Sequence, residues 1–250
     1  MFTSLKPDSN LFTYNPALLT LVETNPRSIE GVLQVMQAID ATCINADGLK
    51  WFNWLYLQVT QAVEKQVSAG GFSDLAWLAE LDVQFAAFYF SALKSWLSGE
   101  ATPGCWRVLF ESRDQRAIAR IQFAIAGINA HINHDLPEAI VATCAVKGTP
   151  PSHDSANYRD YTSVNATLNT LVDTAKAELN FRLPGDSMPP LSTLDQRFEA
   201  WSVSAARESA WQNAECLWQL RTSSLLTDTF LDTLDGLTTV IGKTLLVPVP

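Results

Sequence analysis

Residues 121–137 read IQFAIAGINAHINHDLP, an apolar helical pattern that carries an unusual concentration of polar side chains. Between Asn129 and Asp135 stand two of the chain's three histidines, two asparagines and a carboxylate. Because this segment continues an apolar run, its polar groups are expected to enter the protein interior. A buried polar group left unpaired costs about 1–3 kcal/mol. The stretch therefore predicts either a functional site or a demanding hydrogen-bond network inside a helical core.

A helical wheel with about 100° per residue separates the polar groups of this stretch into two sets. The apolar stripe between them consists of Ile121, Ile125, Ile128 and Ile132. One flank carries the amides Gln122, Asn129 and Asn133. The other flank carries His131 and Asp135 as an i, i+4 pair, while His134 falls on the expected solvent side. Pro137 is expected to end or kink the helix.

The rest of the chain also favours helices. Apolar positions spaced i, i+3, i+4 and i+7 recur, for example from Ile29 to Ile39, and no β-hairpin signal is present. Charged residues make up only 17%, against about 25% in average globular proteins. We predict an all-α, single-domain bundle of about eight to ten helices over residues 1–250. Core helices would occupy residues 26–180, a proline-rich loop 181–193, and C-terminal helices on the same core 194–241.

Composition argues against several partner classes. The net charge is −9 and no Lys/Arg cluster occurs, so neither nucleic acid nor an anionic membrane is expected as a partner. Polar residues interrupt the longest apolar stretches, which predicts no membrane insertion. The four cysteines are far apart and lack Cys-x-x-Cys spacing, as is typical of reduced core thiols. With no signal-peptide pattern, we expect a cytoplasmic protein.

Other predicted helices also place polar residues within apolar surfaces. They include Asn53 and Tyr56 in a tryptophan-rich segment, Tyr161 near the middle of the chain, and Arg207 with Trp211 near its end. If these positions converge with the motif, they would form an apolar cavity with a few inward polar groups. Such a composition is typical of a small-molecule site.

Four segments of the chain resemble an uncharacterised, mostly bacterial family of unknown function. These segments are 47–57 (DGLKWFNWLYL), 121–137, which carries the motif GxNAHINxDLP, 160–165 (DYTSVN) and 206–211 (ARESAW). The resemblance implies a shared architecture and names no reaction. His131-x-x-x-Asp135 is also similar to helices of the zinc-dependent phospholipase C and nuclease fold, but three histidines are too few for a trinuclear site.

Our leading hypothesis is an enzyme, of cyclase, isomerase or hydrolase type, that acts on a small apolar molecule without a cofactor. His131 would be the general acid/base and Asp135 would orient it. The residues expected to position the substrate are Asn129, Asn133, Asn53, Tyr56, Gln122, Tyr161, Arg207 and Trp211. No P-loop, Rossmann fingerprint or G-x-S-x-G elbow points to another chemistry.

Two other functions stay open at this stage. One is a mononuclear metal-dependent hydrolase, with a single metal held by His131, Asp135 and a distant carboxylate. The other is a non-catalytic ligand-binding or interaction module, in which the polar residues satisfy one another across helix interfaces. A homodimer is compatible with either. Structural roles compete as well: His131 could be a bonded core histidine, Asp135 a helix N-cap, and His134 a surface residue.

Overall fold

The computed structural model describes residues 12–179 and 202–248, and this part of the chain contains helices and no strand. The elements are α1 (Asn15–Val22), α2 (Ile29–Thr42), α3 (Gly48–Ala69), α4 (Leu75–Ser98), α5 (Gly104–Ser112), α6 (Arg120–Ala130), the π-helix η1 (His131–Asp135), α7 (Leu136–Lys147), α8 (Ala156–Ser163), α9 (Asn165–Leu179), α11 (Val203–Leu220) and α12 (Ser224–Leu245). The all-α prediction is confirmed. The predicted loop 181–193 lies outside the described residues.

Side-chain caps fix the first turns of several helices, as the sequence suggests. Ser28 accepts a hydrogen bond from the backbone N–H of Gly31 at 3.1 Å, and Asp47 accepts one from Leu49 at 3.0 Å. These caps satisfy backbone donors that have no partner inside the helix. The helices therefore begin where a short polar side chain precedes an apolar periodic run.

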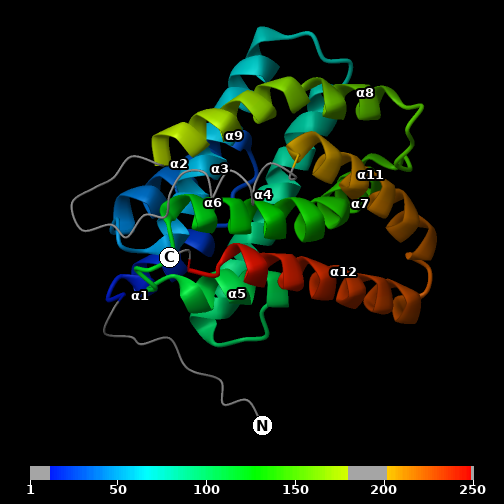
Figure 1. Cartoon of the computed structure of the whole chain (residues 1–250). Helices are drawn as coiled ribbons and strands as arrows, with labels where there is room; N and C mark the ends of the chain where they lie inside the picture. Colours follow the sequence, from blue (N-terminus) through cyan, green and yellow to red (C-terminus); the bar gives the residue numbers. More distant parts are fainter. Residues whose placement is uncertain (1–11, 180–201, 249–250) are drawn as a thin grey trace.

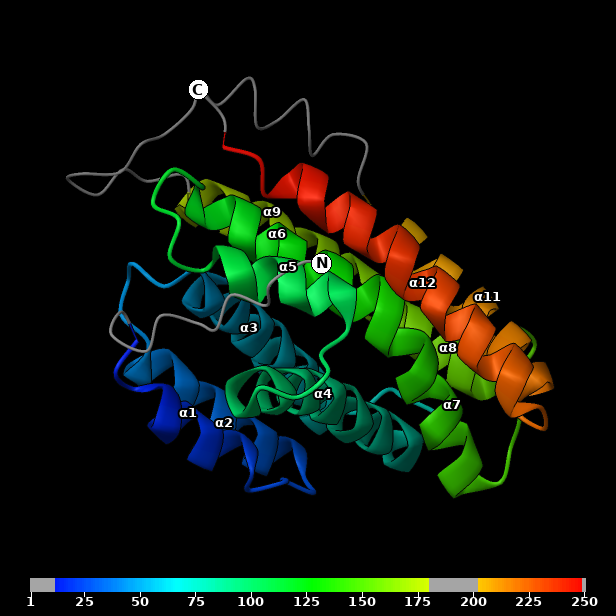
Figure 2. The same ribbon diagram turned by 90° about the horizontal axis from the view of Figure 1, so that it is seen from below.

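The motif forms one continuous rod, α6–η1–α7, at the centre of the bundle (Figure 1). Helix α3 packs against α6, whereas α4 and α11 pack against α7, and α12 packs against α5 and α6. Seen from below, α1 and α2 lie on one side of the molecule and α11 and α12 on the other (Figure 2). The rod is therefore surrounded by helices, and its polar residues face protein on several sides.

Helices α3 and α6 approach closely because each presents a glycine to an aromatic ring of the other. A Cβ atom on Gly127 would lie 2.3 Å from the ring of Phe52, and one on Gly48 would lie 2.4 Å from the ring of Phe123. Only a residue without a side chain fits at either position. This reciprocal packing fixes the position of Phe52 beside the motif.

A buried ion pair ties α3 to the end of α5. Arg113 is 2% exposed and Asp47 is fully buried. The guanidinium donates from Nε to Asp47 Oδ1 at 2.9 Å and from Nη2 to Oδ2. Tyr14 donates to the same carboxylate at 2.8 Å, which anchors the start of α1. This pair shows how the fold neutralises a buried arginine with a carboxylate.

Three further observations concern the helices, the thiols and the surface of the protein. Among the described helices, none combines the length and apolarity needed to span a bilayer. Cys43, Cys105 and Cys144 are buried free thiols, as predicted, whereas Cys216 is exposed and the expectation of a core thiol is wrong there. Helix α12 exposes apolar side chains, among them Leu225 and Leu237. The homodimer stays a prediction.

Candidate functional site

The motif contains a π-helical turn where the sequence predicts a regular helix. The N–H of Leu136 bonds to the carbonyl of His131, five residues earlier. Pro137, the second residue of α7, has no N–H, and its ring disfavours the usual position of the carbonyl four residues before it. The wider turn accommodates this proline, and of the two outcomes expected at Pro137, an end or a kink, the structure excludes an end, because α7 continues through it. Single π turns occur often at functional sites.

Asp135 is the centre of a buried hydrogen-bond network. Its Oδ2 lies 2.8 Å from Nδ1 of His131, and its Oδ1 lies 2.8 Å from Nδ1 of His134. The indole N–H of Trp106 donates to both oxygens, at 3.0 and 3.2 Å. The predicted N-cap role is wrong, because the carboxylate makes no capping hydrogen bond and is fully engaged by these side chains.

Asp135 is ionised despite its burial. Burial alone would raise its pKa, but hydrogen bonds from His131 and His134 outweigh this effect, and the pKa lies below its ordinary value. An ionised carboxylate only accepts hydrogen bonds. Both imidazoles must therefore donate from Nδ1, which fixes their orientation.

His134 is buried, with 7% exposure, so its predicted position on the solvent side is wrong. The π turn shifts the register of the rod and brings the imidazole onto Asp135. Burial lowers the pKa of His134, but the hydrogen bond and the charge of Asp135 outweigh this effect and raise the pKa to about 9. His134 is therefore a cation near neutral pH, and it compensates the charge of Asp135.

His131 has the opposite character. It is 2% exposed, and burial lowers its pKa in spite of the contact with Asp135. The ring is therefore neutral at pH 7, with its proton on Nδ1 and a lone pair on Nε2. Nε2 is buried and has no hydrogen-bond partner within the described residues. The predicted His131–Asp135 pair is confirmed as a contact, and it leaves one nitrogen available for chemistry.

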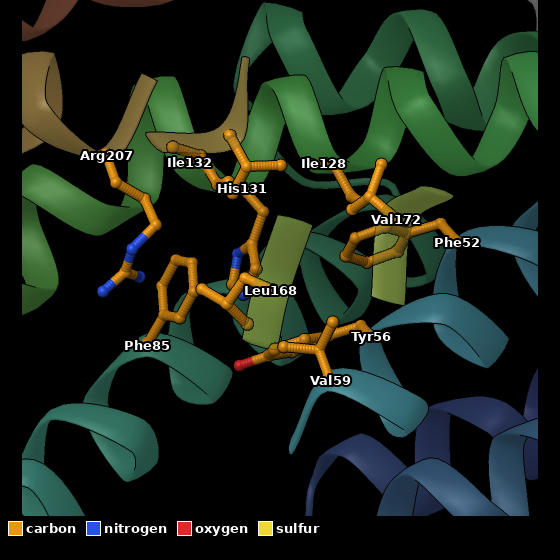
Figure 3. Close-up of a pocket in the computed structure, with 11 residues that line it drawn as sticks. Phe52, Tyr56, Val59, Phe85, Ile128, His131, Ile132, Leu168, Val172 and Arg207 are labelled. Carbon is orange, nitrogen blue, oxygen red and sulfur yellow. The ribbon is translucent and has the colours of Figure 1, made fainter. Parts of the chain in front are cut away.

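Aromatic rings enclose the imidazole of His131. The ring of Phe85 stacks on it with a centroid distance of 3.4 Å and an interplanar angle of 6°. The ring of Tyr56 meets it edge-on, with centroids 4.4 Å apart. Phe52 completes the enclosure at 5.8 Å (Figure 3). This packing excludes water from the ring faces and holds the imidazole in one orientation.

A small cavity of about 50 Å³ borders His131. It is lined by Phe52, Tyr56, Val59, Phe85, Ile128, His131, Ile132, Leu168, Val172, Val203 and Arg207. These residues come from α3, α4, α6, η1, α9 and α11. The sequence prediction that polar residues of several helices converge on an apolar cavity therefore holds for His131, Tyr56 and Arg207.

A second cavity of about 60 Å³ adjoins the first. Tyr56, Val59, Phe85, Leu168 and Arg207 line both cavities.

The second cavity adds Asp82 and Tyr161 to its walls. The Oδ2 of Asp82 and the hydroxyl of Tyr56 are buried without a hydrogen-bond partner in the described part of the chain. Burial, and then the charge of Glu64, raise the pKa of Asp82 to about 7. The two cavities thus share lining residues, and these residues include buried polar atoms without a hydrogen-bond partner in the described part of the chain.

The predicted amide stripe serves the fold instead of the cavity. Gln122 donates to the carbonyl of Leu245 at 2.7 Å, and Asn129 donates to the carbonyl of Thr238 at 3.0 Å. Asn133 donates to the Oδ1 of Asn129 at 3.0 Å. These amides fasten α12 to the central rod, and none of them lines either cavity.

Of the other predicted substrate-binding residues, Asn53 and Trp211 make structural hydrogen bonds, whereas Tyr161 lines the second cavity. Asn53 donates to the carbonyl of Met36 at 2.9 Å and does not line a cavity, and Trp211 is fully buried and donates to Glu215 at 3.2 Å. Tyr161 reaches the second cavity, where its hydroxyl donates to the carbonyl of Arg207 at 2.7 Å.

The site residues predicted from the sequence do not include Phe85, Trp106 or Asp82, although Asp82 stands out as a polar residue in an apolar helical run. Asp82 and Phe85 stand three residues apart on an apolar helix, a spacing that places them on one face and could have been noticed.

A separate group could hold a metal ion. Ligand atoms of Cys105, His134 and Asp235 lie within 4.8 Å of one another. The Asp235 carboxylate accepts hydrogen bonds from the backbone N–H groups of Gly104 and Cys105, both at 2.8 Å, and so caps α5. Burial raises the pKa of the Cys105 thiol far above its ordinary value. This set differs from the ligands predicted from the sequence, which were His131, Asp135 and a distant carboxylate. In the structure, Asp135 and Nδ1 of His131 bond to each other.

The comparisons with known proteins give a family and no chemistry. No curated protein matches the chain, and no solved structure does. A model described as a family of unknown function, DUF5995, matches residues 29–248, so the chain belongs to this family, as the resemblance of its four segments implies.

Proposed function

We propose that the protein is an enzyme that transfers protons on a small, largely apolar molecule, with His131 as general acid/base and Asp135 as its orienting group. One observation carries the proposal: His131 lines a cavity, and its buried Nε2 has no hydrogen-bond partner in the described residues. Leaving such an atom unpaired costs about 1–3 kcal/mol, and a bound substrate would recover this cost.

The surroundings of His131 suit a general base. Its lowered pKa keeps the ring in the basic form at neutral pH, and the Nδ1–H bond to Asp135 directs the Nε2 lone pair away from the carboxylate. When Nε2 takes a proton, the ionised Asp135 stabilises the imidazolium through Nδ1. Tyr56 stays protonated, because burial holds its pKa well above the ordinary value, and its hydroxyl can donate a hydrogen bond to the substrate. Isomerisation and hydrolysis both use such a proton transfer.

Solvent exchange tests the proposal without knowledge of the net reaction. The protein is incubated in D₂O with a panel of small apolar ketones and esters, and mass spectrometry follows deuterium incorporation and hydrolysis. His131→Asn keeps a side-chain N–H for Asp135 but removes Nε2, so we expect a loss of about 10²–10⁴-fold in rate. His153→Asn is the matched control, because His153 is partly exposed and binds Glu208 and Glu215 away from the cavity.

A His131→Asn variant that keeps the wild-type rate would contradict the proposal. An independent reading comes from the imidazole nitrogen shifts of ¹⁵N-histidine-labelled protein. We expect a neutral His131 ring with its proton on Nδ1 at pH 7. A ring that carries a proton on Nε2 at this pH would have no lone pair on that nitrogen and would contradict the role of Nε2 as the base.

The two other functions make different predictions. A metal-dependent hydrolase would use the group Cys105, His134 and Asp235, and it requires stoichiometric metal that is lost in Cys105→Ser. A non-catalytic binding module would bind ligands in the cavity but would show neither exchange nor hydrolysis in the wild-type protein.

A further inference from the structure

Arg207 is a buried cation with no carboxylate partner among residues 12–179 and 202–248. It lies on α11 and is 7% exposed. Its Nε donates to the Oδ1 of Asn165 at 2.7 Å and its Nη2 to the carbonyl of Tyr161 at 2.7 Å. The guanidinium also lies over the ring of Tyr161, 3.9 Å from the centroid. All these partners are neutral, so within the described residues they leave the positive charge uncompensated.

Arg113 shows that the same fold can pair a buried arginine with a carboxylate. Arg113 is equally buried, and two of its nitrogens pair with the carboxylate of Asp47. Asp47 raises the pKa of Arg113, whereas burial lowers that of Arg207. Buried charges are costly unless they are paired. Within the described part of the chain, one buried arginine is therefore neutralised by a carboxylate and the other is not.

The position of Arg207 indicates what could neutralise it. It lines both cavities, and the described residues that line them include no other arginine or lysine. Figure 3 shows its guanidinium on the far side of the Phe85 ring from His131. A guanidinium has five N–H donors, of which two donate to acceptors among the described residues. The remaining donors suit the paired oxygens of one carboxylate.

We infer that the substrate of this site is a small carboxylate with an apolar chain or ring, whose carboxylate binds Arg207. This inference rests on the proposed function, because it assigns the substrate class of the same site. A single cation matches the single charge of a carboxylate. The apolar part would lie along Leu168 and Val172, toward His131.

The size of the cavities adds a requirement. Cavities of about 50 and 60 Å³ are smaller than the roughly 150 Å³ that holds benzene. Phe85 lines both and separates Arg207 from His131, and it is only partly buried. A substrate larger than either cavity needs more room, and displacement of the Phe85 ring, which lines both cavities, would join them.

Matched probes test the inference on the whole protein. Binding of hexanoate and of its neutral counterpart hexanamide is measured by ligand-observed NMR, and the imidazole signals of His131 are followed in parallel. We expect hexanoate to bind at least tenfold more tightly than hexanamide to the wild-type protein. Arg207→Gln should abolish this preference, and Arg207→Lys should keep part of it.

Arg221→Gln is the control for the loss of charge. Arg221 follows the same helix and also stacks on an aromatic ring, that of Trp218 at 4.0 Å, but it is exposed and outside both cavities. The preference for hexanoate should survive there. If Arg207→Gln does not fold, the comparison of the two probes on the wild-type protein still decides.

Equal affinity for the two probes overturns the inference, as does a preference for hexanoate that persists in Arg207→Gln, or the absence of binding by either probe. Equal binding accompanied by shifts of the His131 signals would leave the proposed function standing while the carboxylate assignment fails. Binding of hexanoate through Arg207, together with an unimpaired His131→Asn variant, would uphold the assignment and reject His131 as the base.

Discussion

Gly127→Ala tests the close approach that places Phe52 beside His131. An added Cβ would lie 2.3 Å from Cγ and Cδ2 of Phe52 and 2.6 Å from its Cβ. The ring cannot move aside easily, because Phe52 is fully buried and packs against Tyr89 and Trp106, with centroids 4.9 and 5.1 Å away. The contact near the Phe52 backbone also prevents relief by rotation of the ring alone. Helices α3 and α6 must therefore separate.

The expected effect combines two opposing contributions. Alanine is favoured over glycine inside a helix by about 1 kcal/mol. Overpacking a core typically costs about 1–3 kcal/mol and sometimes more, and a contact this short belongs at the upper end. We therefore expect Gly127→Ala to lower the free energy of unfolding by about 2 kcal/mol.

Gly236→Ala is the control. Gly236 is exposed in α12, and an added Cβ there would meet nothing within 4 Å. It should gain about 0.5–1 kcal/mol from helix propensity alone. Urea unfolding followed by tryptophan fluorescence should thus separate the two variants by about 3 kcal/mol with unchanged slope. If both alanines change stability equally, α3 and α6 are not packed as described, and the position of Phe52 in the site is unsupported.

Three further predictions concern the polar network. Asp135→Asn should lower the free energy of unfolding by about 3–5 kcal/mol in urea, because the buried network loses its anion and His134 loses the partner that raises its pKa. The folded pKa of His134, about 9, exceeds its ordinary value of 6.5, so its stabilising contribution is complete below pH 6.5 and is lost as pH rises through 9. The urea midpoint of the wild-type protein should fall relative to that of His134→Gln between pH 7 and 10. A difference that stays constant over this range would show that His134 does not have a raised pKa in the folded state. Gln122→Leu should cost about 1–3 kcal/mol and speed amide exchange near Leu245, and unchanged exchange would show that this hydrogen bond is not needed.

The sequence predicts the His131–Asp135 contact because i, i+4 residues are neighbours on any helix-like turn. The 2.8 Å distance agrees with that prediction. The burial of His134 could not be predicted on a regular wheel, because the π turn changes the register after His131. Pro137 is the local signal, since it cannot donate the next hydrogen bond. The sequence does not reveal whether the helix accommodates Pro137 by a kink or by a wider π turn.

The role of the amide stripe was also beyond a local pattern. Gln122 and Asn129 are buried polar residues, as the wheel suggests, but their acceptors lie 123 and 109 residues away in the sequence. An amide N–H can donate equally well to a ligand oxygen or to a backbone carbonyl, so the sequence pattern does not distinguish the two acceptors. The apolar walls are equally ambiguous, because Phe85 and Leu168 follow the same spacing as ordinary core residues.

The distribution of satisfied and unsatisfied groups on the central rod bears on the choice between a structural network and a functional site. On one flank, Asn129 and Asn133 have partners at normal distances, as a structural network requires. On the other flank, Nε2 of His131 has none among the described residues, although its Nδ1 is held by Asp135. A histidine kept only for stability would gain by bonding through both nitrogens or by giving way to an apolar residue. The oriented ring with one open nitrogen beside a cavity therefore favours function on this flank and structure on the other.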